Sequence, residues 1–434
     1  MAIGGTQPGR AAAVMNSAFL ATRRQRRGTT ERAHAMHPAT ARTSERLAVP
    51  ERRSGRAIRA RAARRFTRPV ALYVAAHGAL VAATWLFLAR AHIGLVKALE
   101  AGDGGWYVAV ASLGYEHHLV YIAPGVPGQM RIAFFPLLPL LIRAVTDVTS
   151  LGGFTAGLLI TAVASLFAAA GIYALIARYA GHATALATVA LWAIMPTAIF
   201  QSMIYSEALY AALAAWALYA LLESRWLTAG GLTVVAGLSR PSAIALVVVV
   251  CAACLVAIVR NRGRWRAAAG LLVAPCGLGG YLLWLGIRLH NLDAWFISQR
   301  AQGWQSSFDF GRTTLQVISG VAALHTAWPG TPYVFVAAFL LVCVGLALTM
   351  ALNRRTPLAV SGWTWLGILL TLGTSGPWIS KARFILPYFP LLVPVAAIAG
   401  QASRRNQIIA LIVVVLLSGW WSAYFLSLIR VTAL

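Results

Sequence analysis

The sequence predicts an all-α, polytopic membrane protein. Hydrophobic residues make up 59% of its 434 residues and charged residues only 11%, whereas a soluble domain carries about 25% charged residues. Long apolar runs alternate with short basic clusters, which is the pattern of membrane helices joined by loops. Helices are required because the hydrocarbon core of a bilayer offers backbone amides no other partner.

Eleven apolar stretches approach the roughly 20 residues that a helix needs to cross a bilayer core. They define one multi-span domain over residues 69–434, with a long first outer loop (91–151) that carries interfacial helices and a second large outer loop (290–332). In the second span, Gly153 and Gly157 form a G-x-x-x-G pattern, which is typical of close helix packing. The expected spans are 69–90, 152–177, 183–200, 207–222, 226–240, 241–259, 267–289, 333–352, 358–375, 384–400 and 407–429.

The first 68 residues contain sixteen arginines and few large apolar side chains. Such a segment cannot bury a core, and it lacks the apolar stretch and cleavage site of a signal peptide. We expect a disordered basic tail that binds anionic membrane lipids weakly, and Met15 and Met36 offer later translation starts. The net charge of +26 lies in this tail and at the ends of apolar runs, which favours membrane lipids over nucleic acid as partners.

Basic clusters set the expected orientation. If the tail is cytoplasmic, then Arg178, Arg225, the run 260–266, and the pairs at 354–355 and 404–405 all fall on the inner side, as the positive-inside rule requires. This scheme needs the stretch 134–146, with two prolines and Arg143, to be an interfacial or re-entrant helix. The sequence therefore predicts a multi-pass protein of the cell membrane, with any site in the large loops on the outer face.

Several cations break the positive-inside rule on the outer side. Charges are costly near a membrane, so cations retained at outer helix ends indicate an anionic ligand. This interpretation applies to Arg240, Lys381 and Arg383, with interfacial snorkelling as the alternative. Snorkelling is the favoured interpretation for Arg288 and Arg300.

The first outer loop holds an acidic residue in an otherwise acid-poor chain. Asp103, Trp106, Tyr107 and Val110 recur at helical spacing. Asp103 is therefore an N-cap, with the two aromatic residues as interfacial anchors, or a general base at an apolar boundary, and the two roles are compatible because a helix start also favours anions. The glycines at 104 and 105 would let a bulky ligand approach it.

A metal site is a further alternative. Glu116, His117 and His118 could join Asp103 as ligands, but adjacent histidines cannot face one way on a helix and no recognised ligand spacing recurs. A solvated loop, or hydrogen bonds to a sugar, is the favoured interpretation of these residues. The four cysteines fall in expected spans, and neither a cofactor nor a nucleotide-binding glycine motif is indicated.

Five stretches resemble the PIG-V-like mannosyltransferases of the GT-C glycosyltransferase superfamily. In chain order they are "DGGWYVAVASLGY" followed by "RIAFFPLLPLLIR", "PTAIFQSMIYSEALY", "AGLSRPSAIAL", "NLDAWFISQRAQGW" and "KARFILPYFPL". The resemblance implies a polyprenyl-phosphate sugar donor, usually of mannose, and inverting transfer to an acceptor on the non-cytoplasmic face. The chain departs from the family at Gly102, where tryptophan is usual, at Ser206, where threonine is usual, and at 291–294, where the family has Gly-Asp-Pro.

The resemblance also implies roles for single residues, according to their positions in the motifs. Asp103 occupies the place of the catalytic base, and the three outer cations Arg240, Lys381 and Arg383 become candidates for the donor phosphate. The expected sugar or acceptor contacts are Trp106, Tyr107, Tyr115, Glu207, Gln299 and Trp304.

Rival functions remain open from the sequence. A transporter or flippase of a lipid-linked sugar would also have many spans and outer cations, but would usually show interrupted helices in two matching halves. A non-enzymatic scaffold would not need Asp103, Glu207 and Arg383 to converge. A protein O-mannosyltransferase-like enzyme is also compatible, and the acceptor could be a glycan, a lipid or a protein.

Overall fold

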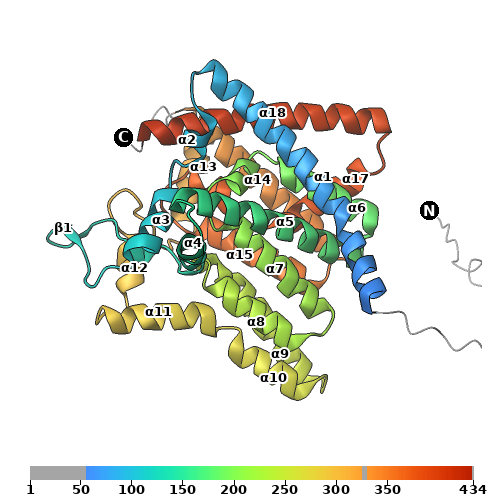
Figure 1. The fold of residues 1–434 in the computed structure, drawn as a ribbon, viewed down its shortest axis with the longest axis horizontal. Coiled ribbons are helices and arrows are strands. Elements are labelled where there is room, and N and C mark those ends of the chain that lie inside the picture. Colours follow the sequence, from blue (N-terminus) through green and yellow to red (C-terminus); the bar gives the residue numbers. More distant parts are fainter. Residues whose placement is uncertain (1–54, 325–329, 433–434) are drawn as a thin grey trace, which may run out of the picture. The chain divides into compact units, whose positions relative to one another are not determined.

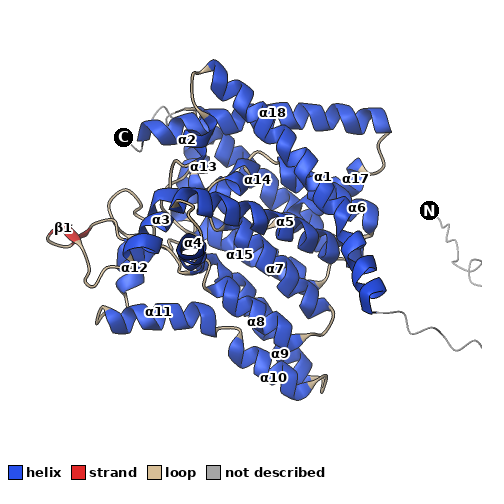
Figure 2. Ribbon diagram, viewed as in Figure 1, coloured by secondary structure: helices blue, strands red, loops and turns tan. Residues whose placement is uncertain are grey.

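Helices form most of the chain described by the computed structural model, which covers residues 55–324 and 330–432 (Figures 1 and 2). The one sheet among these residues is a hairpin of β1 (Tyr121–Ala123) and β2 (Val126–Pro127). Within the same residues, six helices are long and apolar enough to cross a membrane. The predicted fold class, an all-α polytopic membrane protein, is confirmed.

The six long helices each coincide with a predicted span. One of them contains a break at Pro275, because proline cannot donate the backbone hydrogen bond of a regular helix. The long helices are α1 (Gly55–Arg90), α5 (Gly153–Ala180), η3 with α9 (Pro241–Ala243 and Ile244–Val259), α10 with α11 (Arg264–Val273 and Cys276–Arg288), α14 (Thr331–Leu352) and α18 (Arg404–Thr432).

The other five predicted spans are shorter apolar helices; 207–222, 226–240 and 358–375 match their helices to within three residues, whereas 183–200 and 384–400 were predicted too long. A helix of 13 residues rises only about 20 Å, less than the roughly 30 Å hydrocarbon core of a bilayer. Pro196 follows the first of these helices, Pro241 follows the third and Pro387 precedes the last, and the residue before a proline disfavours helical geometry. These helices are α6 (His182–Ile194), α7 (Glu207–Leu222), α8 (Trp226–Gly237), α15 (Leu358–Gly373) and η4 with α17 (Phe389–Leu392 and Val393–Ala399).

The first helix starts earlier than predicted. We expected residues 1–68 to be disordered, but α1 already begins at Gly55. The stretch 55–68 is rich in alanine and arginine, which are among the best helix formers. The remainder of the expected tail, residues 1–54, lies outside the described residues.

The first loop segment, residues 91–151, consists largely of short helices. It contains α2 (Leu95–Leu99), α3 (Gly104–Leu113), η1 (Arg131–Ala133) and α4 (Leu137–Val148). In α4, Leu138 and Ile142 are buried against α3 and α5, whereas Arg143 and Asp147 are exposed and pair at 3.6 Å. This amphipathic helix has only 12 residues and is too short to cross a bilayer core, as the interfacial interpretation requires.

Two glycines of α5 allow the first loop segment and the residues before α7 to pack closely against this helix. A Cβ atom on Gly153 would lie 2.8 Å from Val108 of α3, and one on Gly157 would lie 2.7 Å from Ile204. Both distances are too short for a real side chain, so these positions need glycine. The predicted close packing at this G-x-x-x-G pattern is confirmed, and it places α3 and the segment before α7 on the same face of α5.

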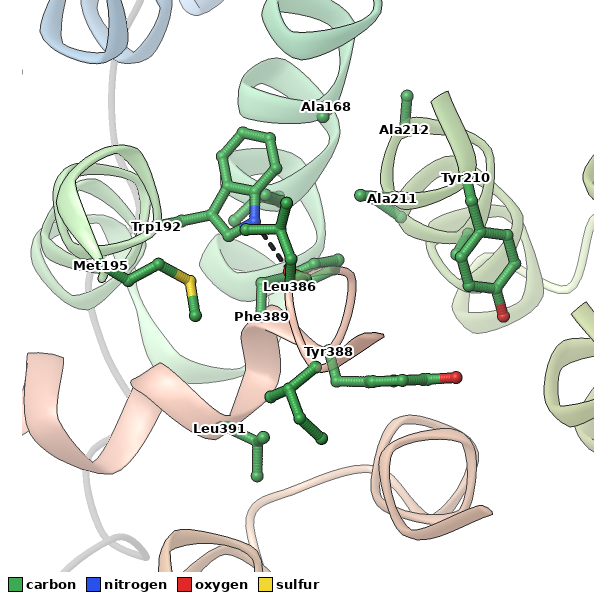
Figure 3. Packing of buried hydrophobic residues seen from close by; sticks show 14 of the residues in the cluster. Ala168, Trp192, Met195, Tyr210, Ala211, Ala212, Leu386, Tyr388, Phe389 and Leu391 are labelled. Carbon is green, nitrogen blue, oxygen red and sulfur yellow. Dashed lines mark hydrogen bonds between the residues drawn. The ribbon is translucent and has the colours of Figure 1, made fainter. Parts of the chain in front are cut away.

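The second loop segment, residues 290–332, contains α12 (Ala294–Gln299) and α13 (Arg312–Ala322), and α16 (Ser380–Phe384) follows α15. The turn after α16 is fixed in the main hydrophobic core (Figure 3). Trp192 of α6 donates a hydrogen bond from Nε1 to Leu386 O at 3.0 Å. The neighbouring Tyr388 packs against Gly367 of α15, where a Cβ would overlap its ring. These contacts hold α16 in place.

Candidate functional site

Four charged side chains from four distant segments form one cluster. Arg383 Nη1 lies 2.7 Å from Asp103 Oδ2, and Arg383 Nε lies 3.2 Å from Glu207 Oε1. The same Glu207 oxygen lies 3.1 Å from Arg240 Nη1. The chain of contacts therefore runs from Arg240 through Glu207 and Arg383 to Asp103.

Each of these residues lies where a helix starts or breaks. Asp103 precedes α3, Glu207 begins α7, Arg240 lies in extended backbone between α8 and η3, and Arg383 lies in the short α16. Non-helical backbone among apolar helices is tolerated where it is buried in protein or lines a polar cavity. The short helices thus end at the charged cluster.

The N-cap interpretation of Asp103 is half right. Asp103 occupies the N-cap position of α3, but its side chain makes no capping hydrogen bond. The carboxylate instead accepts a hydrogen bond from Arg383. The backbone N–H of Asp103 donates to the hydroxyl oxygen of Tyr205 at 3.0 Å.

The exposed fraction of the charged side chains falls from Asp103 through Arg383 to Glu207. The Asp103 side chain is 31% exposed, Arg383 is 11% exposed, and Glu207 is only 2% exposed. Buried charges require partners, and here two carboxylates balance two guanidinium groups. Burial by itself lowers the pKa of Arg383, but the charges of Asp103 and Glu207 outweigh it and raise that pKa above its ordinary value.

The cluster retains unused hydrogen-bonding atoms. Arg383 Nε, both Nε and Nη1 of Arg240, and Glu207 Oε2 are buried without a hydrogen bond. The N–O distances of 3.1 and 3.2 Å are therefore ion pairs in which the N–H groups are not aimed at the carboxylate. Buried polar atoms are nearly always paired, so these donors are suited to an anionic ligand.

Tyr205 supports the cluster and was missed by the sequence analysis. The Arg383 guanidinium carbon lies 4.4 Å from the centre of the Tyr205 ring, and the neighbouring Phe384 ring is 5.1 Å away. Such cation–π contacts favour the charged guanidinium. The only signal in the sequence was that Tyr205 stands two residues before Glu207 in one of the resembling stretches.

An aromatic group lies three residues from Asp103. The rings of Trp106, Phe134 and Trp304 lie with centres 5.6–5.7 Å apart, Trp106 stacked on Phe134 and Trp304 edge-on to both. Trp106 and Trp304 are partly exposed, so they join the two loop segments and leave aromatic surface accessible. Tyr107 is buried beneath them, and its hydroxyl lies 3.1 Å from Ser206 Oγ.

Lys381 is not brought to the cluster, which corrects the expectation that it contacts the same anion as Arg383. Its ammonium group is buried and donates to Thr371 O at 2.8 Å and to Thr374 O. It therefore satisfies carbonyl groups at the C-terminal end of α15. Burial lowers the pKa of Lys381 to about 8, and the charge of Asp309 partly opposes this shift.

One expected sugar contact, Tyr115, has a structural role. The Tyr115 hydroxyl donates to Phe134 O at 2.8 Å, which fixes the backbone leading into α4. Gln299 ends α12, where its backbone carbonyl oxygen accepts a hydrogen bond from Ser306 N, and its side chain stays a predicted sugar contact.

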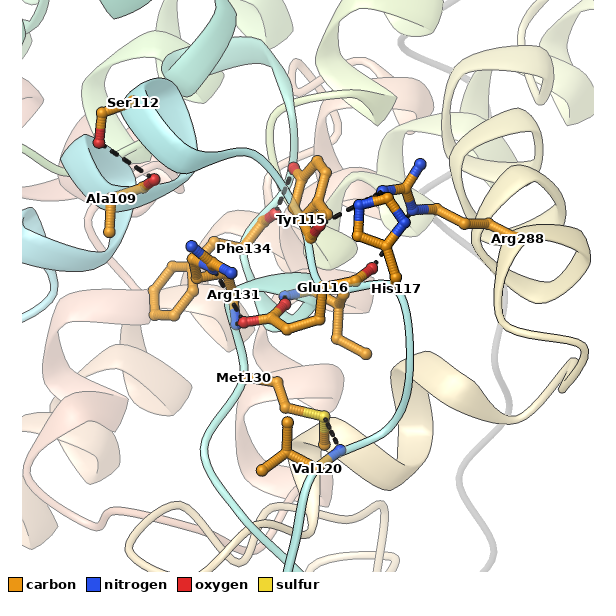
Figure 4. A network of polar contacts seen from close by, with 11 residues as sticks. Ala109, Ser112, Tyr115, Glu116, His117, Val120, Met130, Arg131, Phe134 and Arg288 are labelled. Carbon is orange, nitrogen blue, oxygen red and sulfur yellow. Dashed lines mark hydrogen bonds and ion pairs between the residues drawn. The ribbon is translucent and has the colours of Figure 1, made fainter.

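The polar residues after Tyr115 form a separate network (Figure 4). Glu116 accepts hydrogen bonds from the backbone and side chain of Arg131, both at 2.9 Å, and Arg288 of α11 contacts Tyr115 O, Glu116 O and the His117 ring. Arg288 therefore anchors the hairpin segment, and interfacial snorkelling does not describe it. Among the described residues, no three His, Cys, Asp or Glu side chains gather closely enough to hold a metal ion.

Comparison with known proteins gives structural likeness only. No protein-family model matches the chain, and no curated protein matches it significantly. The apo crystal structure of ArnT from Cupriavidus metallidurans is similar at 17% identity and TM-score 0.47, over 75% of this chain and 61% of that one. The ArnT structure bound to undecaprenyl phosphate is similar at 16% identity and TM-score 0.48, over 77% and 62%. This chain thus spans about three fifths of ArnT, and at these TM-scores we draw no functional conclusion from the likeness.

Proposed function

We propose that this protein is a membrane glycosyltransferase of the GT-C type. It transfers a sugar from a polyprenyl-phosphate donor to an acceptor hydroxyl, with inversion, on the non-cytoplasmic face of the cell membrane. The motif resemblance to PIG-V-like enzymes favours mannose. The acceptor is a glycan, lipid or protein hydroxyl.

One observation carries the proposal. The four residues matched by motif position, Asp103, Glu207, Arg240 and Arg383, are the four that converge, although they come from segments up to 280 residues apart. A partly exposed carboxylate next to two guanidinium groups with unused donors provides a proton acceptor and an anion site in one place. A scaffold would not need this arrangement.

The reaction follows from these roles. The acceptor oxygen attacks the anomeric carbon and gives its proton to Asp103. The bond between the anomeric carbon and the phosphate oxygen breaks, and its electron pair leaves with the phosphate. Arg240 and Arg383 stabilise the growing negative charge of the leaving phosphate.

The aromatic group offers a surface for the sugar. Trp106 and Trp304 are partly exposed and contact each other, and Trp106 follows Asp103 by three residues on α3. Indole rings pack against the apolar faces of ligands while polar groups nearby fix their orientation. Glu207 contacts both arginines through Oε1 and is almost fully buried, so we assign it to the phosphate site, and direct sugar binding by Glu207 is not part of the proposal.

Substitution of Asp103 tests the proposal. Purified Asp103→Asn protein in proteoliposomes with polyprenyl-phosphate mannose and membrane glycolipid or glycan acceptors should retain its fold and lose about 10²–10⁴-fold in transfer rate. Glu100→Gln changes a nearby carboxylate that makes none of the ion pairs of the cluster, and it should transfer at the wild-type rate. Full transfer by Asp103→Asn would remove Asp103 from the mechanism. Translocation of the donor without transfer would favour the flippase alternative.

A further inference from the structure

Arg383 has two tasks that conflict. Its Nη1 is bound to the carboxylate of Asp103 at 2.7 Å, yet the proposed reaction needs the same guanidinium for the donor phosphate. In the empty cluster two carboxylates already neutralise two arginines. A phosphate that binds Nη1 of Arg383 must therefore compete with the Asp103 carboxylate, whereas the free donors of Arg240 are open to it without competition.

The charge balance of the reaction shows which carboxylate yields. The phosphodiester donor carries one negative charge, and the released polyprenyl phosphate carries up to two. As the leaving phosphate gains a negative charge, Asp103 gains the acceptor proton and loses one. The total charge of the pocket therefore stays constant during transfer, and Asp103 is the carboxylate that gives up its charge, so a guanidinium that has passed from Asp103 to the phosphate keeps a negative partner.

We propose that Arg383 exchanges partners during the catalytic cycle, releasing Asp103 and binding the donor phosphate through the same edge of its guanidinium group. This inference rests on the proposed function. In the protein without donor, Arg383 pairs with Asp103, the proposed base. The phosphate of a bound donor takes Arg383 from Asp103, which is then free to accept the proton of the acceptor hydroxyl. Sugar transfer is thereby linked to the presence of donor.

The contacts around Arg383 fit such an exchange. The Tyr205 ring at 4.4 Å and the Glu207 carboxylate at 3.2 Å hold the guanidinium from the buried side. Asp103 lies on the more open side, and its carboxylate is the most exposed group of the cluster. The hydrogen bond from Asp103 N to the Tyr205 hydroxyl keeps the backbone near the site after the carboxylate is released.

Glu207 is not the partner that leaves. It is nearly fully buried and contacts both arginines, so its release would leave a carboxylate uncompensated in an apolar setting, which is costly. Asp103 can turn toward water instead. The exchange therefore takes place at Nη1 of Arg383, while the contact of Nε with Glu207 persists.

The test is direct binding of undecaprenyl phosphate to detergent-solubilised protein, with the affinity measured by microscale thermophoresis. If Asp103 competes for Arg383, then Asp103→Asn should bind undecaprenyl phosphate about tenfold more tightly than wild type, at the low end of what a charge-assisted hydrogen bond contributes. The gain should vanish in the Arg383→Gln background. Undecaprenol, which has the chain without the phosphate, should bind wild type and Asp103→Asn equally.

Two further variants make the outcomes decisive. Glu100→Gln should leave the affinity unchanged. Arg383→Lys provides a second background if Arg383→Gln does not fold, and the gain should shrink there because lysine cannot span Glu207 and the phosphate together. A gain of equal size without Arg383 would reduce the effect to charge repulsion and overturn the exchange.

The remaining outcomes separate the two proposals. Equal or weaker binding by Asp103→Asn, with clear binding by wild type, overturns the exchange and leaves the proposed function standing. Absence of undecaprenyl phosphate binding by wild type and Asp103→Asn alike overturns the proposed donor and the exchange together.

Discussion

Glu207 Oε1 lies 3.1 Å from Arg240 Nη1, and this buried ion pair joins the start of α7 to the break after α8. The negative charge at the first residue of α7 also interacts favourably with the helix dipole. Because the same oxygen contacts Arg383, one carboxylate sets the spacing of both guanidinium groups. Glu207 is thus a positioning residue for the proposed phosphate site.

Glu207→Gln should destabilise the protein by about 3 kcal/mol, because removal of one partner leaves two buried arginines short of a counter-charge. Thermal unfolding of the purified protein in detergent measures the loss. Glu223→Gln is the matched control at the other end of α7, where Glu223 pairs with the exposed Arg178, and it should have little effect. Similar unfolding temperatures for the two variants would contradict the structural role of Glu207.

Arg240→Gln should raise the KM for the polyprenyl-phosphate donor by about tenfold or more, since Nε and Nη1 of Arg240 are two buried donors without a hydrogen bond. The KM for the acceptor should stay within about twofold. Steady-state kinetics with each substrate varied in turn make the comparison. Arg288→Gln, which affects the separate network at Tyr115 and Glu116, should lower stability without this selective change. A change in both KM values alike would remove Arg240 from the phosphate site.

Gly157→Ala should impair the site through packing alone. The new Cβ would lie 2.7 Å from Ile204, one residue before Tyr205, and overpacking of a core costs about 1–3 kcal/mol. The shift of this segment should lower kcat as well as stability. Gly152→Ala, where nothing lies within 4 Å of the added atom, should match wild type in both. Equal activity and stability of the two variants would show that α5 tolerates displacement of the 203–206 segment.

The sequence was sufficient to find the charged residues of the site but not their contacts. Asp103 stands out because acids are rare, and Arg240 and Arg383 because outer cations are costly in a membrane, whereas Glu207 was found only by its place in a stretch that resembles the mannosyltransferase family. Their convergence depends on how the helices pack, and no spacing along the chain encodes an ion pair between residues 280 apart. Tyr205 and Phe134 were missed for the same reason, since aromatic residues are common in every apolar segment.

Other errors of the sequence analysis could have been avoided by arguments from helix geometry and propensity. Lys381 was grouped with Arg383, yet residues two apart on a helix point in different directions, and the ammonium group faces the end of α15 instead. The predicted spans 183–200 and 384–400 contain prolines at 196, 387, 390 and 394, which explain why α6 and α17 are short. The early start of α1 at Gly55 was concealed by arginines, whose charge indicates solvent exposure but whose propensity favours a helix.

Lys381 should make stability depend on alkaline pH. Burial lowers its pKa to about 8 in the folded protein, whereas an unfolded lysine titrates near about 10.4. Between these values the unfolded chain binds more protons than the folded one, so the contribution of this group to stability rises as the pH increases. Lys381→Met removes the titration. The free energy of unfolding of wild type, relative to Lys381→Met, should therefore increase from pH 8 to pH 10, as measured by denaturant unfolding in detergent. A flat or falling difference over this range would mean that the ammonium group is solvated and does not satisfy the carbonyl groups at the end of α15.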